Sequence, residues 1–137
     1  MSAFEFHGWA ALRDTHHQIE LDRDAELESK LVLKAAVAEI ENYLHEQFKF
    51  PSSLHLSNGS HYLTFSGCSN HYRDAPLDLF KFVNLVAPGS YGLLYILDTE
   101  DKDWRNQMQV WVLKRTTLSR HSDPFLSPFH NECEEYY

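Results

Sequence analysis

The sequence has few basic residues and few cysteines, and each shortage excludes a class of protein. Its 137 residues contain 12 lysines and arginines against 20 aspartates and glutamates, a net charge of −8. A protein that binds nucleic acid needs a basic surface to replace the counterions on the phosphates, so we expect no nucleic-acid partner. Two cysteines, Cys68 and Cys133, are too few for a disulfide framework and have no CxxC spacing, so we expect free thiols.

Long apolar segments are also missing. A membrane-spanning helix needs about 20 consecutive apolar residues, whereas the most apolar stretch, residues 31–40, is broken by Lys34 and Glu39. Residues 1–5 lack the basic region and apolar core of a signal peptide. We therefore expect no membrane partner and a cytoplasmic location.

The length and composition are those of one globular domain. Hydrophobic residues make up 43% of the chain and aromatic residues 14%, enough to build a core rather than a disordered chain. Two domains of half this length would each struggle to bury a core. We expect a single domain over residues 1–137.

The first half of the chain predicts a strand, a long helix and a hairpin. Residues 3–13 alternate with a period of two, which is typical of a half-buried strand, and Gly8 within it indicates a bulge or a close approach of another group. Asp22 or Asp24 can cap a helix whose apolar face runs to about residue 48. The dipeptide Asn58-Gly59 predicts a two-residue hairpin with Ser57 opposite Ser60.

The second half predicts another helix and two more strands. Asp74 and Pro76 open the helix, and Pro88-Gly89 closes it. Strands at residues 91–97 and 107–113 follow, joined by an acidic loop. We expect residues 119–137 to form an extended tail packed on the core through Phe125, Leu126 and Phe129. The predicted fold class is α+β, a largely antiparallel sheet with two helices packed on it.

Catalytic motifs are not visible, although the chain has nine histidines. No HExxH, HxH, Walker or GxSxG pattern occurs, so we expect no catalytic residue, no metal and no cofactor. The alternative is a small histidine-using enzyme or ligand-binding domain, in which His7, His71 and His121 would converge. A third possibility is an assembly module that uses exposed aromatic residues.

Acidic clusters beside aromatic residues are the other candidate sites. Carboxylates next to an apolar anchor are what a protein would use to bind a cationic partner. The alternative is that Trp104 packs into the core and that its loop is a solvated turn. The candidate binding residues are Glu20, Asp22 and Asp24, then Asp98, Glu100, Asp101, Asp103 and Trp104, and, on the first strand, Trp9 and His7.

Short motifs spread along almost the whole chain carry a resemblance. They are residues 4–9 (FEFHGW), 58–60 (NGS), 64–67 (TFSG) with Asn70 and His71, 87–95 (APGSYGLLY), 110–113 (VWVL) and 123–128 (DPFLSP). With these motifs in this order, the chain resembles the bacterial polymorphic-toxin immunity proteins of immunity protein family seven.

The resemblance implies a non-enzymatic antitoxin that binds a cognate toxin C-terminal domain as a monomer or in a 1:1 heterocomplex. Partner toxins of such systems are often nucleases delivered by contact-dependent inhibition, and a nuclease that binds a polyanion is often basic. An acidic inhibitor can cover such an active site. The motif residues are mostly apolar, glycine or proline, so they indicate scaffold and do not name the residues that contact the toxin.

Overall fold

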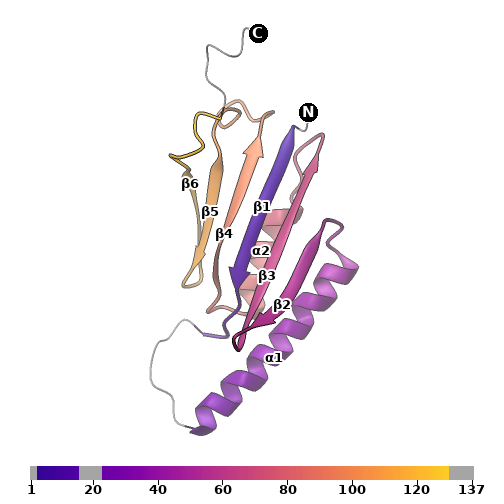
Figure 1. Cartoon of the computed structure of the whole chain (residues 1–137), viewed down its shortest axis with the longest axis vertical. Coiled ribbons are helices and arrows are strands. Elements are labelled where there is room, and N and C mark those ends of the chain that lie inside the picture. Colours follow the sequence, from indigo (N-terminus) through magenta and orange to yellow (C-terminus); the bar gives the residue numbers. More distant parts are fainter. Residues whose placement is uncertain (1–2, 16–22, 130–137) are drawn as a thin grey trace.

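The computed structural model describes residues 3–15 and 23–129, and its main element is one six-stranded antiparallel sheet. The order of the strands in the sheet is β2-β3-β1-β4-β5-β6 (Figure 1). This is the α+β, antiparallel fold that the sequence predicts. The bounds are β1 Phe4–Ala11, α1 Arg23–Glu46, β2 Ser52–Ser57, β3 Ser60–Ser69, α2 Ala75–Val86, β4 Tyr91–Asp98, β5 Gln109–Lys114 and β6 Thr117–Ser122.

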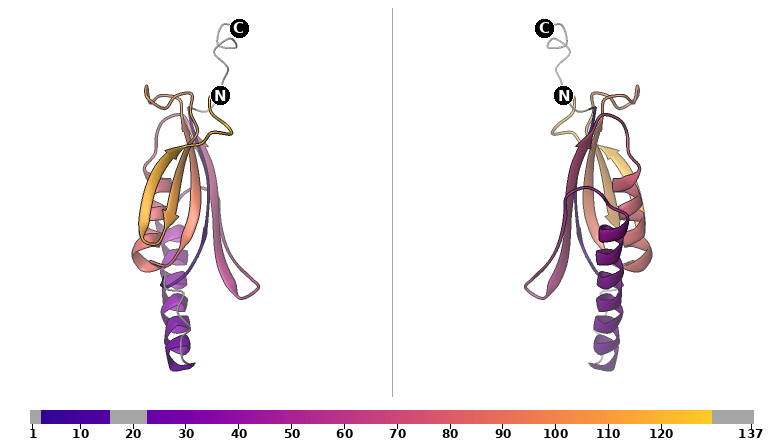
Figure 2. Two further views of the ribbon diagram at one scale, coloured as in Figure 1. Left: turned by 90° about the vertical axis from the view of Figure 1, so that its left-hand side faces the viewer. Right: turned by 90° about the vertical axis from the view of Figure 1, so that its right-hand side faces the viewer.

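Both helices lie on one side of the sheet (Figure 2). Successive side chains of a strand point to opposite faces, so alternate residues of the central strands meet the helices and form the core. Ile40 of α1 and Phe80 of α2 are fully buried against them. The strand residues in this core include Phe4 and Phe6 of β1, Leu63 and Phe65 of β3, and Leu94 and Ile96 of β4.

The central strand β1 confirms one of the two expectations for Gly8. Its pairing with β3 and β4 is continuous from Phe4 to Ala11, so the strand has no bulge. A Cβ atom at Gly8 would lie 2.3 Å from the Phe65 ring. Glycine is therefore needed for the close approach of that ring to the strand.

Helix α1 begins at Arg23 and ends at Glu46, close to the expected limits. Its N-terminal half projects beyond the sheet (Figures 1 and 2). Leu27 and Leu31 are exposed in this part, Leu31 by 68%. The buried residues of the helix, Ala36 and Ile40, lie in its C-terminal half, which supplies most of its contacts with the core.

The hairpin of β2 and β3 has the predicted turn and register. Ser57 pairs with Ser60 and His55 with Tyr62, and Asn58 and Gly59 have φ angles of 50° and 78°. Both residue types tolerate positive φ, as the type I′ turn requires.

The sixth strand is missing from the sequence prediction, which has an extended tail from residue 119. Residues 117–122 instead form β6, paired with β5 through a turn at Arg115 and Thr116. Both turn residues have positive φ, 51° and 66°. The strand was missed because two-residue turns of this kind are recognised by asparagine, aspartate or glycine, and this turn has none.

The segment after β6 is held by backbone hydrogen bonds, not by the apolar side chains predicted to pin it. Phe125 is 90% exposed, and Leu126 and Phe129 are also exposed, so that expectation is wrong. The Asp123 amide donates to the Met108 carbonyl at 2.9 Å, and the Phe129 amide donates to the Asn106 carbonyl at 2.9 Å. These bonds tie residues 123–129 to the loop between β4 and β5.

Candidate functional site

The face of the sheet opposite the helices carries apolar and aromatic side chains in register. Trp9 pairs with Leu93 in the neighbouring strand, and Leu93 pairs with Val112 in the next. In the adjacent row, Tyr95 pairs with both His7 and Val110. No element of the described chain covers this face, which we call the open face. An antiparallel sheet with helices on one side normally presents polar residues on the other.

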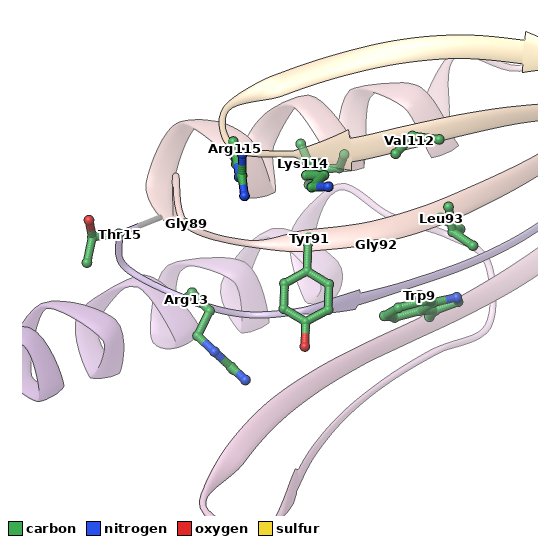
Figure 3. A pocket seen from close by; sticks show the side chains of 11 residues that line it. Trp9, Arg13, Thr15, Gly89, Tyr91, Gly92, Leu93, Val112, Lys114 and Arg115 are labelled. Carbon is green, nitrogen blue, oxygen red and sulfur yellow. The ribbon is translucent and has the colours of Figure 1, made fainter. Parts of the chain in front are cut away.

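Two hollows mark the open face, and Trp9 borders both. The first, of about 510 Å³, lies where β1 ends and β4 begins; its floor includes Tyr91 and Leu93 (Figure 3). The second, of about 500 Å³, lies further along β1 and is bordered by His7 and Tyr95. Trp9 is 38% exposed and its ring meets that of Tyr91 edge to face, with centroids 6.2 Å apart. Trp9 therefore forms the centre of the open face.

The motif at residues 87–92 builds the first hollow by drawing the end of β1 against the start of β4. The Gly89 amide donates to the Arg13 carbonyl at 3.1 Å, and the Ser90 hydroxyl accepts from the Arg13 amide at 3.1 Å. A Cβ atom at Gly89 would lie 1.9 Å from the Thr15 carbonyl oxygen, so only glycine fits. The interpretation of this motif as scaffold agrees with these contacts, although Tyr91 within it is 43% exposed on the open face.

Three cations surround the first hollow. Arg13 follows β1, Lys114 ends β5 and Arg115 lies in the turn before β6 (Figure 3). The Arg13 guanidinium lies 5.8 Å from the centre of the Tyr91 ring. Sequence reasoning did not place the three together, because Arg13 is far along the chain from the adjacent Lys114 and Arg115 and only the register of the sheet brings them to one hollow.

The acidic loop lies at the other end of β4, remote from this hollow (Figure 1). Asp98 is only 7% exposed, and its carboxylate accepts a hydrogen bond from the Glu100 amide at 3.2 Å. Burial raises the pKa of Asp98, and the charges of Asp101 and Glu100 add to the shift. Asp101 accepts from the Asp103 amide at 3.0 Å. The carboxylates of Asp98 and Asp101 thus stabilise the conformation of the loop through hydrogen bonds to its amides, and they also give the loop its negative charge.

Trp104 of the same loop is half-buried, between the two alternatives that the sequence left open. The Arg120 guanidinium lies 4.6 Å from the centre of its ring and 5.4 Å from that of Trp111. The cation stacks on the aromatic faces. Trp104 therefore packs on β6 and offers less free surface than Trp9.

The remaining candidate residues lie apart from one another. Asp24 is in the first turn of α1, at the end of the molecule away from the acidic loop (Figure 1). Glu20 and Asp22 lie outside the described residues. His7 is exposed on the open face and bonds to Glu5 at 3.0 Å. The predicted binding residues therefore form three separate groups: the start of α1, the acidic loop and the open face.

The histidines of the enzyme alternative do not converge. His71 is bonded to Glu100 at 2.7 Å in the acidic region. His7 and His121 share a row on the open face, but Tyr95 and Val110 stand between them, which separates the two by about 14 Å at the usual strand spacing. Residues 3–15 and 23–129 contain no group of three metal-ligating side chains, and no helix among them is long and apolar enough to cross a membrane.

Comparison with known proteins identifies the family. No curated protein and no solved structure matches the chain. The family model described as immunity protein 7 matches residues 3–135, which includes every element of the sheet and both helices. The chain therefore belongs to the immunity protein 7 family, whose members act against a toxin.

Proposed function

We propose that this immunity protein neutralises one cognate toxin domain by covering it with the open face of its sheet. The observation that carries the proposal is the apolar patch of the exposed Trp9 and Tyr91 and the half-buried Leu93, beside two hollows on a face that no described element covers. Partly exposed aromatic residues beside hollows are typical of the anchors that dominate protein interfaces. Eight residues of β4 span about 27 Å, the width of a standard interface.

The charge of the chain favours a basic partner. A net charge of −8 accelerates encounter with a cationic protein, and the acidic loop places Glu100 and Asp103 in solvent at one end of the sheet. Nucleases bind a polyanion and need cationic surface to do so. The proposed target is therefore a basic nuclease, such as an RNase delivered by contact-dependent inhibition.

In this proposal the protein acts in the cytoplasm of the cell that makes it, as one copy bound to one toxin domain. The complex blocks the active site sterically, without breaking a bond and without a cofactor. The interface centres on Trp9 and His7 of the open face, with the exposed side chains of Glu100 and Asp103 at its acidic end. Asp24 lies in the first turn of α1, and α1 is on the other side of the sheet from the open face, so Asp24 does not belong to the same contact (Figure 2).

The test measures binding to the toxin domain encoded beside this chain. Calorimetry gives the dissociation constant, and survival of cells that produce the toxin shows protection. The wild-type protein is expected to bind below micromolar concentration, with an association rate that falls as salt is added. Trp9→Ala should weaken binding by about 30-fold or more, since it removes the central anchor. Leu31→Ala, which truncates an apolar side chain that is 68% exposed on α1, away from the open face, should change binding by less than about threefold.

Two results would overturn the proposal. One is a toxin domain that does not bind the wild-type protein at micromolar concentration. The other is a folded Trp9→Ala protein that binds and protects as well as the wild type, because the open face would then not be the contact surface. Thermal unfolding of both variants establishes that the fold is intact.

A further inference from the structure

The first hollow of the open face is cationic in a protein that is acidic as a whole. Among the described residues, eleven border it, and they include Arg13, Lys114 and Arg115 and no aspartate or glutamate (Figure 3). Three of the twelve lysines and arginines in the chain thus surround one hollow. We call this site the cationic hollow.

These cations are not neutralised within the part of the chain that the structure describes. The close contacts between a basic nitrogen and a carboxylate there are those of His7 with Glu5 and His71 with Glu100, and neither involves these cations. The guanidinium of Arg13 donates to the Leu12 carbonyl at 2.9 Å, and Lys114 and Arg115 are exposed. Within residues 3–15 and 23–129, these positive charges therefore have no carboxylate partner beside the apolar floor.

The turn that carries Arg115 is held in an unfavourable backbone conformation. Arg115 and Thr116 both have positive φ, which costs about 1–3 kcal/mol for a residue other than glycine. The Asn84 side-chain amide of α2 donates to the Thr116 carbonyl at 3.1 Å and helps to hold the turn. The sequence keeps an arginine at a position where asparagine or glycine would relieve this cost.

We propose that the cationic hollow binds an acidic segment of the cognate toxin. One aromatic or aliphatic side chain of that segment lies on the floor formed by Trp9, Tyr91 and Leu93, and the carboxylates of the segment pair with Arg13, Lys114 and Arg115. Arginine forks match carboxylates in paired hydrogen bonds, and the apolar floor excludes water from them. Trp9 borders both this hollow and the second one. The two hollows therefore form a continuous surface, which suits an extended segment of a partner chain. The inference rests on the proposed function, because it names the toxin chemistry that this part of the open face recognises.

The inference predicts that adding negative charge at the cationic hollow weakens toxin binding, whereas the overall charge of the chain alone would predict that it strengthens binding. If overall charge alone decided binding to a basic toxin, replacing any exposed lysine or arginine by glutamate would strengthen the complex. If an acidic segment sits in the cationic hollow, the same replacement there places like charges together and weakens the complex. The two cases can be separated with variants of equal net charge.

The experiment compares Lys114→Glu/Arg115→Glu with Lys30→Glu/Lys34→Glu, measuring the dissociation constant for the toxin domain by calorimetry. All four side chains are exposed, and Lys30 and Lys34 lie on α1, away from the open face. The double variant in the hollow is expected to bind at least about tenfold more weakly than wild type. The double variant on α1 is expected to bind as tightly as wild type or tighter.

A carbodiimide, which couples an amine directly to a neighbouring carboxylate, supplies a second measurement on the wild-type complex. A cross-link from Lys114 to an aspartate or glutamate of the toxin is expected in the digest by mass spectrometry, and none from Lys30. If the wild-type protein binds the toxin but the hollow variant binds equally well and Lys114 forms no cross-link, the inference alone is overturned. If the wild-type protein does not bind the toxin, the proposed function falls and this inference with it.

Discussion

The two ends of the sheet carry charges of opposite sign, and the charges are used differently. At the acidic end, Asp98 and Asp101 accept hydrogen bonds from backbone amides of their own loop, and Glu100 is bonded to His71. At the cationic end, Lys114 and Arg115 point into solvent beside an apolar floor. A carboxylate that accepts hydrogen bonds within its own turn is part of the local structure, whereas an unpaired charge beside an exposed apolar surface is available to a partner.

This difference shows why acidic runs in a sequence are ambiguous markers of binding. Carboxylates that follow one another in a loop are well placed to accept from neighbouring amides, so their clustering has a structural cause. Cations that are brought together from distant parts of the chain have no such local cause. Arg13 and Lys114 border the same hollow only because β1 and β5 lie on either side of β4.

The largest expected effect concerns the backbone contact that builds the cationic end. Gly89→Ala would place a Cβ atom 1.9 Å from the Thr15 carbonyl oxygen, and this neighbour is backbone, which cannot rotate away. We expect a loss of about 3 kcal/mol in the free energy of unfolding, measured with urea. The matched change is Gly59→Ala, where φ is 78° and no atom lies within 4 Å of the added Cβ; backbone conformation alone should cost about 1 kcal/mol. Equal stability of the two variants would show that the contact at Gly89 is not needed.

Sequence reasoning predicts most of the fold because the signals involved are local. The alternation in β1, the apolar face of α1 and the Asn58-Gly59 turn each reflect a period or a backbone preference that neighbouring residues determine. The strand β6 was missed because its turn uses Arg115 and Thr116, whose conformation is imposed by strand pairing and by Asn84. Tertiary contacts override local preference there, and no local signal reports them.

The candidate site could be predicted only in part, for the same reason. Trp9 and His7 were found because their parity in β1 places them opposite the core. Tyr91 and Arg13 were not, since their role depends on which strand lies beside β1. The positions of the acidic residues are correct in the chain, but sequence alone could not show that Asp98 is buried.

A smaller effect is expected from the turn at the cationic end. Thr116→Gly removes the cost of a φ of 66° at a β-branched residue, and part of this gain is offset by the greater freedom of glycine in the unfolded chain. We expect a net gain of about 1 kcal/mol in the free energy of unfolding, with toxin affinity unchanged because Arg115 keeps its charge. Thr117→Gly, in the extended strand β6, should lower stability instead. If both variants lose stability alike, the turn is not strained.

The smallest effect concerns the acidic end and depends on pH. Burial raises the pKa of Asp98 above its ordinary value of 3.8, so the folded protein holds this proton more tightly than the unfolded chain does. Stability is then lost as pH rises from about 3.8 through the raised pKa, and the ionised carboxylate destabilises the fold at neutral pH. Asp98→Asn keeps an acceptor for the Glu100 amide and removes this charge.

Thermal unfolding between pH 4 and pH 8 tests this expectation. Asp98→Asn should unfold at a higher temperature than wild type at neutral pH, and the difference should shrink as pH falls toward 4. Asp103→Asn is the matched control, because it removes a carboxylate from the same loop at an exposed position. If both variants changed the pH dependence equally, the loss of one negative charge would explain the effect and burial of Asp98 would not. A difference confined to Asp98→Asn would show that this carboxylate belongs to the fold, leaving the exposed charges of the loop to meet the toxin.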